Sequence, residues 1–192
     1  MGRSREFDEN VVLEKAMELF WRQGYEKTSM NDLVEHMGIH RRSLYDAFGD
    51  KHTLFLKAMD FYEELIKNKI KAGILHAETS KQAIQFIFDF IIEGYEDKQW
   101  GCLIVNSATE MALRDKEVEE KIERVFKETE QLIADLVRKG QQTGEISCNY
   151  DSDILSEVFQ NTLHGIRVQL RMSASKEKLH RIANFFLDLL YK

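Results

Sequence analysis

The sequence predicts an all-helical protein of about nine helices. Apolar residues recur at intervals of three and four along almost the whole chain, which is the spacing of a buried helical face, and no stretch alternates with the period of two typical of a strand. Proline, which breaks helices, is absent from all 192 residues. With 43% hydrophobic residues, the chain has enough apolar side chains for a sizeable core, which argues against intrinsic disorder.

Local signals place three short helices in the first fifty residues. The carboxylate of Asp8 can cap the first helix, and Gly24 can end it. Ser29 begins the second with a capping-box-like pattern, and Gly38 stops it. The third is very short and runs from about His40 to Phe48. The chain therefore opens with three helices of little more than two to four turns each.

Longer helices are expected in the rest of the chain. The fourth begins after Asp50, and the first plausible loop is the segment from Gly73 to Thr79. The remaining helices should begin at Ser80, near Cys102, at about Asp115, at Asp151 and at Ser175, and the one that begins near Asp115 should extend to Gln142.

Cysteine content and hydropathy bound the compartment. Cys102 and Cys148 are the only cysteines, so the sequence has neither a disulfide framework nor four thiols for a structural zinc, and a reducing compartment is expected. The N-terminus has no apolar stretch behind it, and the longest apolar run, Phe86 to Ile92, is short and is interrupted by Asp89. We therefore expect a cytoplasmic protein that does not enter a membrane.

The second and third helices have the spacing of a helix-turn-helix, because a four-residue turn centred on Gly38-Ile39 joins them. A helix that reads the major groove needs hydrogen-bond donors on its exposed face, since guanine presents two acceptors there and phosphates flank the groove. The side chains that meet this need, and that we predict to bind DNA, are Thr28, Ser29, His40, Arg41, Arg42, Ser43, Tyr45 and Lys51.

The charge of this region is local rather than general. Residues 1–60 hold nine Lys and Arg against eleven Asp and Glu, and the whole chain has a formal net charge of −6. Charges more than about 8 Å apart are screened at physiological salt. DNA binding would therefore depend on a cluster of cations on one face, with the acidic residues facing elsewhere.

Residues from about Val11 to Leu56 resemble the DNA-binding domain of the TetR/AcrR family of bacterial repressors. The resemblance lies in Ala16, Leu19-Phe20, Gly24-Tyr25, Thr28-Ser29, Asp32-Leu33, Gly38-Ile39, Ser43-Leu44-Tyr45, Phe48, Lys51 and Leu54. It implies a helix-turn-helix DNA-binding domain over residues 1–50, joined by a long fourth helix to a ligand-binding and dimerisation domain over residues 51–192. It also implies a homodimer that binds double-stranded operator DNA, near-palindromic in sequence, and that a small-molecule inducer releases.

Carried over residue by residue, the resemblance assigns phosphate contacts to Thr28, Tyr45 and Lys51. Base contacts fall on the exposed face of the third helix, at Arg41, Arg42 and Ser43. Asp46 and Ala47 depart from the larger polar or aromatic residues that many members have before the phenylalanine. Fewer contacts are therefore expected from the end of this helix.

The resemblance places an inducer pocket among the fourth to eighth helices and a dimer interface on the last two. The candidate pocket residues, a mostly apolar set with a few polar groups, are Phe61, Phe86, Phe90, Trp100, Cys102, Asn106, Met111, Phe159, His164 and Arg167. The candidate interface residues are Val158, Phe159, Leu163, Ile166, Ile182, Phe185, Phe186 and Leu189. Each aromatic in these sets could instead be an ordinary core residue.

Two polar positions have competing interpretations. His164 and Arg167 lie one turn apart and would favour a carboxylate or carbonyl ligand, or else form a salt bridge or a dimer contact. Cys102 lies where a helix should begin, which would stabilise a reactive thiolate. It also opens an apolar run and could be a small buried hydrophobe, and Cys148 could pair with it only if the fold brought the two close.

Enzymatic function has little support. The chain contains no His-Glu-x-x-His, no Gly-x-Ser-x-Gly and no phosphate-binding glycine loop, and His36 and His40 straddle Gly38 and would not share a helical face. We therefore expect no catalytic residues, no metal and no cofactor. The alternative from another class is a helical protein-interaction adaptor without sequence-specific DNA binding, which would lack an affinity for DNA that weakens steeply with salt.

Overall fold

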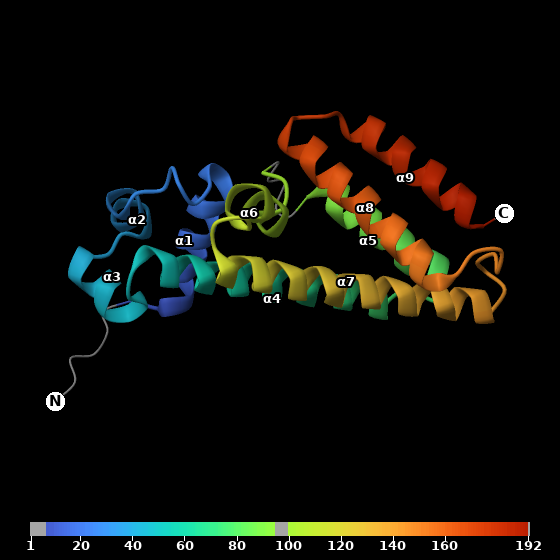
Figure 1. The fold of residues 1–192 in the computed structure, drawn as a ribbon, viewed down its shortest axis with the longest axis horizontal. Coiled ribbons are helices and arrows are strands. Elements are labelled where there is room, and N and C mark those ends of the chain that lie inside the picture. The colour runs from blue at the N-terminus through green and yellow to red at the C-terminus, as the bar shows by residue number, and fades with distance from the viewer. Residues whose placement is uncertain (1–6, 95–99, 192) are drawn as a thin grey trace.

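A computed structural model of the protein describes residues 7–94 and 100–191, and these residues form nine α-helices and no strand. The helices are α1 (Glu9–Gln23), α2 (Met30–Met37), α3 (Arg41–Phe48), α4 (Lys51–Leu75), α5 (Ser80–Glu93), α6 (Leu103–Met111), α7 (Lys116–Gln142), α8 (Ser152–Arg171) and α9 (Lys176–Leu190). The molecule is elongated, with α1–α3 at one end and α9 at the other, and α4 and α7 run along its length (Figure 1). None of the helices in these two described ranges is long and apolar enough to cross a bilayer.

Most of the predicted helix ends are confirmed. The Asp8 carboxylate accepts a hydrogen bond from the Asn10 N–H at 2.9 Å and caps α1. At α2 the capping box is complete, because Ser29 Oγ accepts from the Asp32 N–H while the Asp32 carboxylate accepts from the Ser29 N–H. Asp151 and Ser175 cap α8 and α9, since their side chains accept from N–H groups of the first turn.

Two expectations around the α4–α5 connection were wrong. The helix α4 continues to Leu75, so Gly73 lies within it and not in a loop. Packing explains this, because a Cβ on Gly73 would lie 1.9 Å from Cζ of Phe86, and α5 therefore rests directly on the α4 backbone. The cap of α5 is Thr79, whose hydroxyl accepts from the Gln82 N–H, while Ser80 is the buried first residue of the helix.

The first of two hydrophobic cores joins α1, α2 and α3 to the first half of α4, to α6 and to the start of α7. Its largest buried side chains include Phe20, Trp21 and Phe55. The Trp21 ring packs edge-on against Tyr62 of α4, with 4.9 Å between the ring centroids. Packing therefore continues across residue 50, and the helix-turn-helix shares its core with α4 and α6.

The second core lies between α5, the distal half of α7, α8 and α9. Three aromatic rings meet at its centre, since Phe88 lies 4.6 Å from Phe159 and 5.8 Å from Phe186, measured between centroids. Fully burying such side chains stabilises a fold by about 1.5–3 kcal/mol each. This core holds α8 and α9 against α5 and leaves one face of each helix exposed.

Candidate DNA-binding surface and ligand cavity

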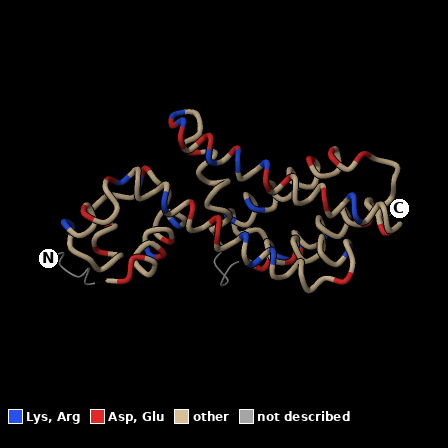
Figure 2. The backbone as a smooth tube through the Cα atoms, turned by 90° about the horizontal axis from the view of Figure 1, so that it is seen from below, with Lys and Arg blue, Asp and Glu red and all other residues tan. Residues whose placement is uncertain are grey.

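The exposed face of α3 carries the predicted base-reading donors. Leu44 and Phe48 are buried and fix the rotation of the helix, which turns Arg41, Arg42 and Tyr45 outward. His40 is the N-cap residue of α3, and its exposed side chain makes no capping hydrogen bond; Ser43 is half-buried. Figure 2 shows basic and acidic residues interspersed along the backbone at this end of the molecule.

The two arginines of α3 are held differently. Arg41 donates from Nη1 to Oδ1 of Asn31, a residue of α2, at 3.0 Å, and its guanidinium lies 5.8 Å from the centroid of the Tyr45 ring. Arg42 is 93% exposed in its side chain, and its one ion pair within residues 7–94 and 100–191 is with Asp46, at 3.7 Å. Exposed pairs of this kind contribute little, so Arg42 is free to bind another acceptor.

The start of α4 lies against the α1–α2 turn. Lys51 Nζ lies 4.1 Å from the centroid of the Tyr25 ring, which is a cation–π contact. Ser29, the exposed N-cap of α2, is on the same turn. A lysine therefore packs on the turn that leads into α2, and a helix N-terminus is a site suited to phosphate.

Thr28 is the exception among the predicted DNA contacts. Its side chain is fully buried, donates to the carbonyl of Gly24 at 2.5 Å and accepts from Nε2 of Gln23 at 3.2 Å. Its N–H donates to the carbonyl of Tyr25. Both polar groups are therefore used inside the turn, and Thr28 shapes the surface without presenting its hydroxyl there.

A cavity of about 400 Å³ lies between α4, α6, α7 and α8. Its walls are mostly apolar, and its mouth carries charged residues of α4 and α7. The apolar wall residues are Ile66, Ile70, Ile104, Val125, Phe126 and Leu132. Of the predicted pocket residues, Cys102 and Arg167 line it. The volume falls within the range of about 300–1,000 Å³ typical of small-molecule sites.

Cys102 and Tyr62 form part of the cavity wall. Cys102 is buried, is the N-cap residue of α6 and makes no side-chain capping bond. The Tyr62 hydroxyl is buried, and burial raises its pKa well above its ordinary value. Tyr62 therefore stays protonated at neutral pH. Cys148 is exposed in the α7–α8 turn, beside Gln141 at the far end of α7, so the chain itself does not bring the two thiols together.

His164 packs behind the cavity wall. Its ring lies 4.3 Å from that of Phe126, measured between centroids, and its Nε2 is buried without a hydrogen-bond partner in the described residues. Burial, with a smaller contribution from the charge of Arg167, lowers the pKa of His164 to about 4. The imidazole is therefore neutral at physiological pH.

The other predicted pocket residues lie elsewhere, because tertiary packing uses them. Phe86 and Phe90 stack on each other along α5, and Phe61 borders a separate hollow beside α1. Trp100 packs edge-on against Trp21. Met111 is buried in the first core and Phe159 in the second.

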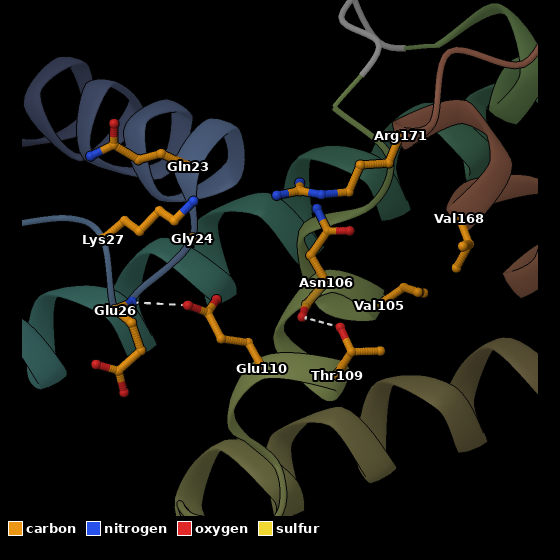
Figure 3. A pocket seen from close by; sticks show the side chains of 10 residues that line it. All are labelled: Gln23, Gly24, Glu26, Lys27, Val105, Asn106, Thr109, Glu110, Val168 and Arg171. Carbon is orange, nitrogen blue, oxygen red and sulfur yellow. Dashed lines mark hydrogen bonds between the residues drawn. The ribbon is translucent and has the colours of Figure 1, made fainter.

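Asn106, the remaining candidate, lies at a hollow of about 370 Å³ where the α1–α2 turn meets α6 and α8 (Figure 3). The Glu110 carboxylate of α6 accepts from the N–H of Tyr25 at 3.1 Å and from the N–H of Glu26 at 2.9 Å. Arg171 of α8 donates to the Trp21 carbonyl at 3.3 Å. Thus α6 holds the turn that precedes the helix-turn-helix, and α8 holds the last turn of α1.

A further contact joins α4 to α7. His52 Nε2 lies 2.7 Å from the carboxylate of Asp115, the residue that caps α7. Lys51 immediately precedes His52. The contact therefore ties the start of α4, which carries Lys51, to the start of α7.

One face of α8 and α9 is apolar and exposed. Val158, Phe185 and Leu189 are about half exposed or more, and Ile182 is half-buried. The other predicted interface residues, Phe159, Leu163, Ile166 and Phe186, face the second core instead, because they lie on the opposite side of the same helices. Ile154, Val168 and Met172 extend the exposed stripe along α8.

Comparison with known proteins decides the family. Residues 12–58 match the family model described as bacterial regulatory proteins, tetR family, and residues 84–186 match the one described as tetracyclin repressor-like, C-terminal domain. The chain belongs to the TetR family. It is therefore a DNA-binding transcriptional regulator and not an enzyme.

Relatives of this TetR-family chain include two curated regulators. The HTH-type transcriptional regulator YezE of Bacillus subtilis (strain 168) is 40% identical over 80% of both chains. The HTH-type transcriptional repressor ComR of Escherichia coli (strain K12) is 31% identical over 98% of this chain and 91% of its own. Among solved structures, a cysteine-substituted form of the TetR-family regulator CifR, complexed with a 26-base-pair operator duplex, superimposes with a TM-score of 0.88. It is 26% identical and covers 98% of this chain and 100% of its own.

Sequence reasoning missed several residues that this TetR-family fold uses. Asn31 gave no signal beyond being polar, yet it holds Arg41. Glu110 lies 85 residues from Tyr25, and His52 lies 63 residues from Asp115. No local pattern reports on pairs so far apart along the chain.

Proposed function

We propose that this regulator is a cytoplasmic repressor that binds near-palindromic operator DNA as a homodimer and leaves it when a small molecule enters the cavity between α4 and α7. The observation that carries the proposal is the face of α3, where exposed arginines project from a helix fixed by Leu44 and Phe48. In this proposal, residues 1–50 read DNA, and residues 51–192 bind the ligand and dimerise. The relatives named as repressors support the direction of regulation.

On DNA, α3 lies in the major groove. Arg41, Arg42 and Ser43 reach base edges, and an arginine is the side chain best suited to the paired acceptors of guanine. Tyr45, Lys51 and the N-terminus of α2 at Ser29 bind flanking phosphates. His40 begins the reading helix and adds a further donor at its N-terminal end.

The apolar face of α8 and α9 supports the homodimer. Val158 and Phe185 are 48% and 68% exposed, and monomeric soluble proteins rarely leave such residues grouped on one surface. Gly165 lies on α8 with open space around the position of a Cβ, which permits close approach of another helix. A two-fold dimer through this face presents two α3 helices to half-sites about one helical turn apart, or a multiple of it.

Release of operator DNA on ligand binding follows from the first core, which the cavity-lining helices share with the helix-turn-helix. The cavity borders Tyr62 of α4 and Cys102 of α6, and both helices pack with the helix-turn-helix in the first core. A ligand that favours a shifted position of α4 moves Lys51 and the α1–α2 turn with it, since His52 and Glu110 link these parts to α7 and α6. The two reading helices then no longer match the half-site spacing.

The test is fluorescence anisotropy with duplexes from the upstream intergenic region of the gene, with random duplex as competitor, across a series of salt concentrations. Binding should survive the competitor, and the logarithm of the affinity should fall linearly with the logarithm of the salt concentration. Selection from a random-sequence library then defines the half-sites. A protein that enriches no sequence from this library and shows no salt-sensitive affinity for DNA is the helical adaptor instead.

A further inference from the structure

The cavity holds a positive charge that the described residues leave unpaired. Arg167 of α8 lines the cavity, and no carboxylate in residues 7–94 and 100–191 forms an ion pair or hydrogen bond with it. It is half-buried. A guanidinium that is partly removed from water without a counter-ion favours an anionic partner, because pairing offsets its cost of desolvation.

The acids that line the same cavity are paired with other cations. Arg124 Nη2 lies 2.7 Å from the carboxylate of Glu63. Lys67 Nζ lies 2.6 Å from the carboxylate of Glu128. A third lining acid, Asp135, pairs with Arg138 at 2.8 Å. These acids are therefore neutralised where they stand, and none of them compensates Arg167.

The titratable groups around Arg167 are neutral or able to donate. On α4, burial raises the pKa of the Tyr62 hydroxyl, so the hydroxyl stays protonated and can donate to a carboxylate oxygen. On α8 itself, His164 is neutral at physiological pH. A guanidinium and a hydroxyl donor thus border a cavity whose remaining walls are chiefly apolar.

We propose that the inducer is a small amphipathic carboxylate. Its carboxylate pairs with the Arg167 guanidinium and accepts from the Tyr62 hydroxyl, and its apolar body packs between Ile66 of α4 and Phe126 of α7. This inference rests on the proposed function, since it names the ligand class for the same cavity.

The test uses the full-length protein and a probe panel that has acids with matched neutral amides: hexanoate, octanoate, phenylacetate and 4-phenylbutyrate, each with its primary amide. Isothermal titration calorimetry measures binding directly, without operator. At least one acid should bind with an affinity about tenfold or more above that of its amide, because a charge-assisted hydrogen bond to a guanidinium is stronger than a neutral one. Equal affinities within the pairs, or no binding by any acid, would overturn the inference.

Substitutions locate the binding group. Arg167→Met should lower the affinity for the acid at least about tenfold and leave the affinity for the amide unchanged, while Arg167→Lys should recover part of the loss. Arg181→Met, which removes the same charge from the exposed surface of α9, should have no effect. Circular dichroism confirms that each variant is folded. An unchanged acid affinity in folded Arg167→Met refutes the assignment.

Operator release is measured separately by anisotropy. Acids that bind at Arg167 without releasing operator would leave the ligand class in place and refute the release step of the proposed function. Operator binding that no acid reverses, together with calorimetry that shows no acid binding, would refute the ligand class and leave DNA binding intact.

Discussion

Replacing Glu110 with alanine should destabilise the protein, because this carboxylate holds the turn between α1 and α2. Its two oxygens accept from the N–H groups of Tyr25 and Glu26 at 3.1 and 2.9 Å. Glu110 lies 85 and 84 residues away from these two partners along the chain. The turn also carries Tyr25, whose ring makes the cation–π contact with Lys51. The substitution therefore tests whether α6 positions the DNA-binding end of the molecule.

The expected loss in unfolding free energy is about 2 kcal/mol. A hydrogen bond to a charged group contributes about 1.5–3 kcal/mol when its loss leaves a buried partner unsatisfied. Here the hollow of about 370 Å³ beside the turn lets water replace part of each lost bond, which puts each at about 1 kcal/mol. Glu110→Gln keeps one carbonyl acceptor and should cost about half as much.

Urea denaturation at a fixed protein concentration measures these losses, and anisotropy on the operator measures their effect on DNA binding. Glu123→Ala, which removes an exposed carboxylate from α7, is the matched control and should change stability by less than about 0.5 kcal/mol. If Glu110→Ala were no more destabilising than this control, the carboxylate would not be holding the turn. Operator affinity should fall in Glu110→Ala, since the turn then positions Lys51 less well.

Three further predictions follow from the same structure. In competition anisotropy, Arg42→Ala should reduce the binding free energy by about 1–3 kcal/mol on the operator and by little on random DNA, whereas Lys51→Ala should weaken binding to both nearly equally. Equal losses on both DNAs for Arg42→Ala would show that this residue does not read bases. Folded His164 stays neutral down to about pH 4, while in the unfolded chain it takes up a proton near pH 6.5. The unfolding free energy should therefore fall as the pH drops from 6.5 to 4. Denaturation at several pH values should show that His164→Asn abolishes this part of the pH dependence. Parallel pH profiles for the two proteins would contradict it. Phe185→Glu, at a position 68% exposed, should give a folded monomer by sedimentation velocity, and a dimer of unchanged affinity would exclude this face as the interface.

Local chemistry explains why so much of the fold was predictable. The caps at Asp8 and Ser29 form between residues two or three positions apart, so the sequence holds both partners. The exposed face of α3 could be predicted equally well, because the helical period places Arg41, Arg42 and Tyr45 opposite Leu44 and Phe48. These features depend on the geometry of a single helix or turn.

Which buried face borders a cavity depended on the packing of several helices. Periodicity places both Phe159 and Phe126 on the buried faces of their helices. Phe159 nevertheless packs in the second core, beside α5, whereas Phe126 lines the cavity between α4 and α7.

Local sequence specified most of the helix ends, the caps other than that of α5, and the donors of the reading helix, since interactions within a few residues govern all three. Helix packing placed Arg167 at a cavity where no acid of the described residues pairs with it, and it brought Glu110 to a turn 85 residues away. Those outcomes depend on how helices cross in space, and contacts across such separations leave no periodic trace in the chain.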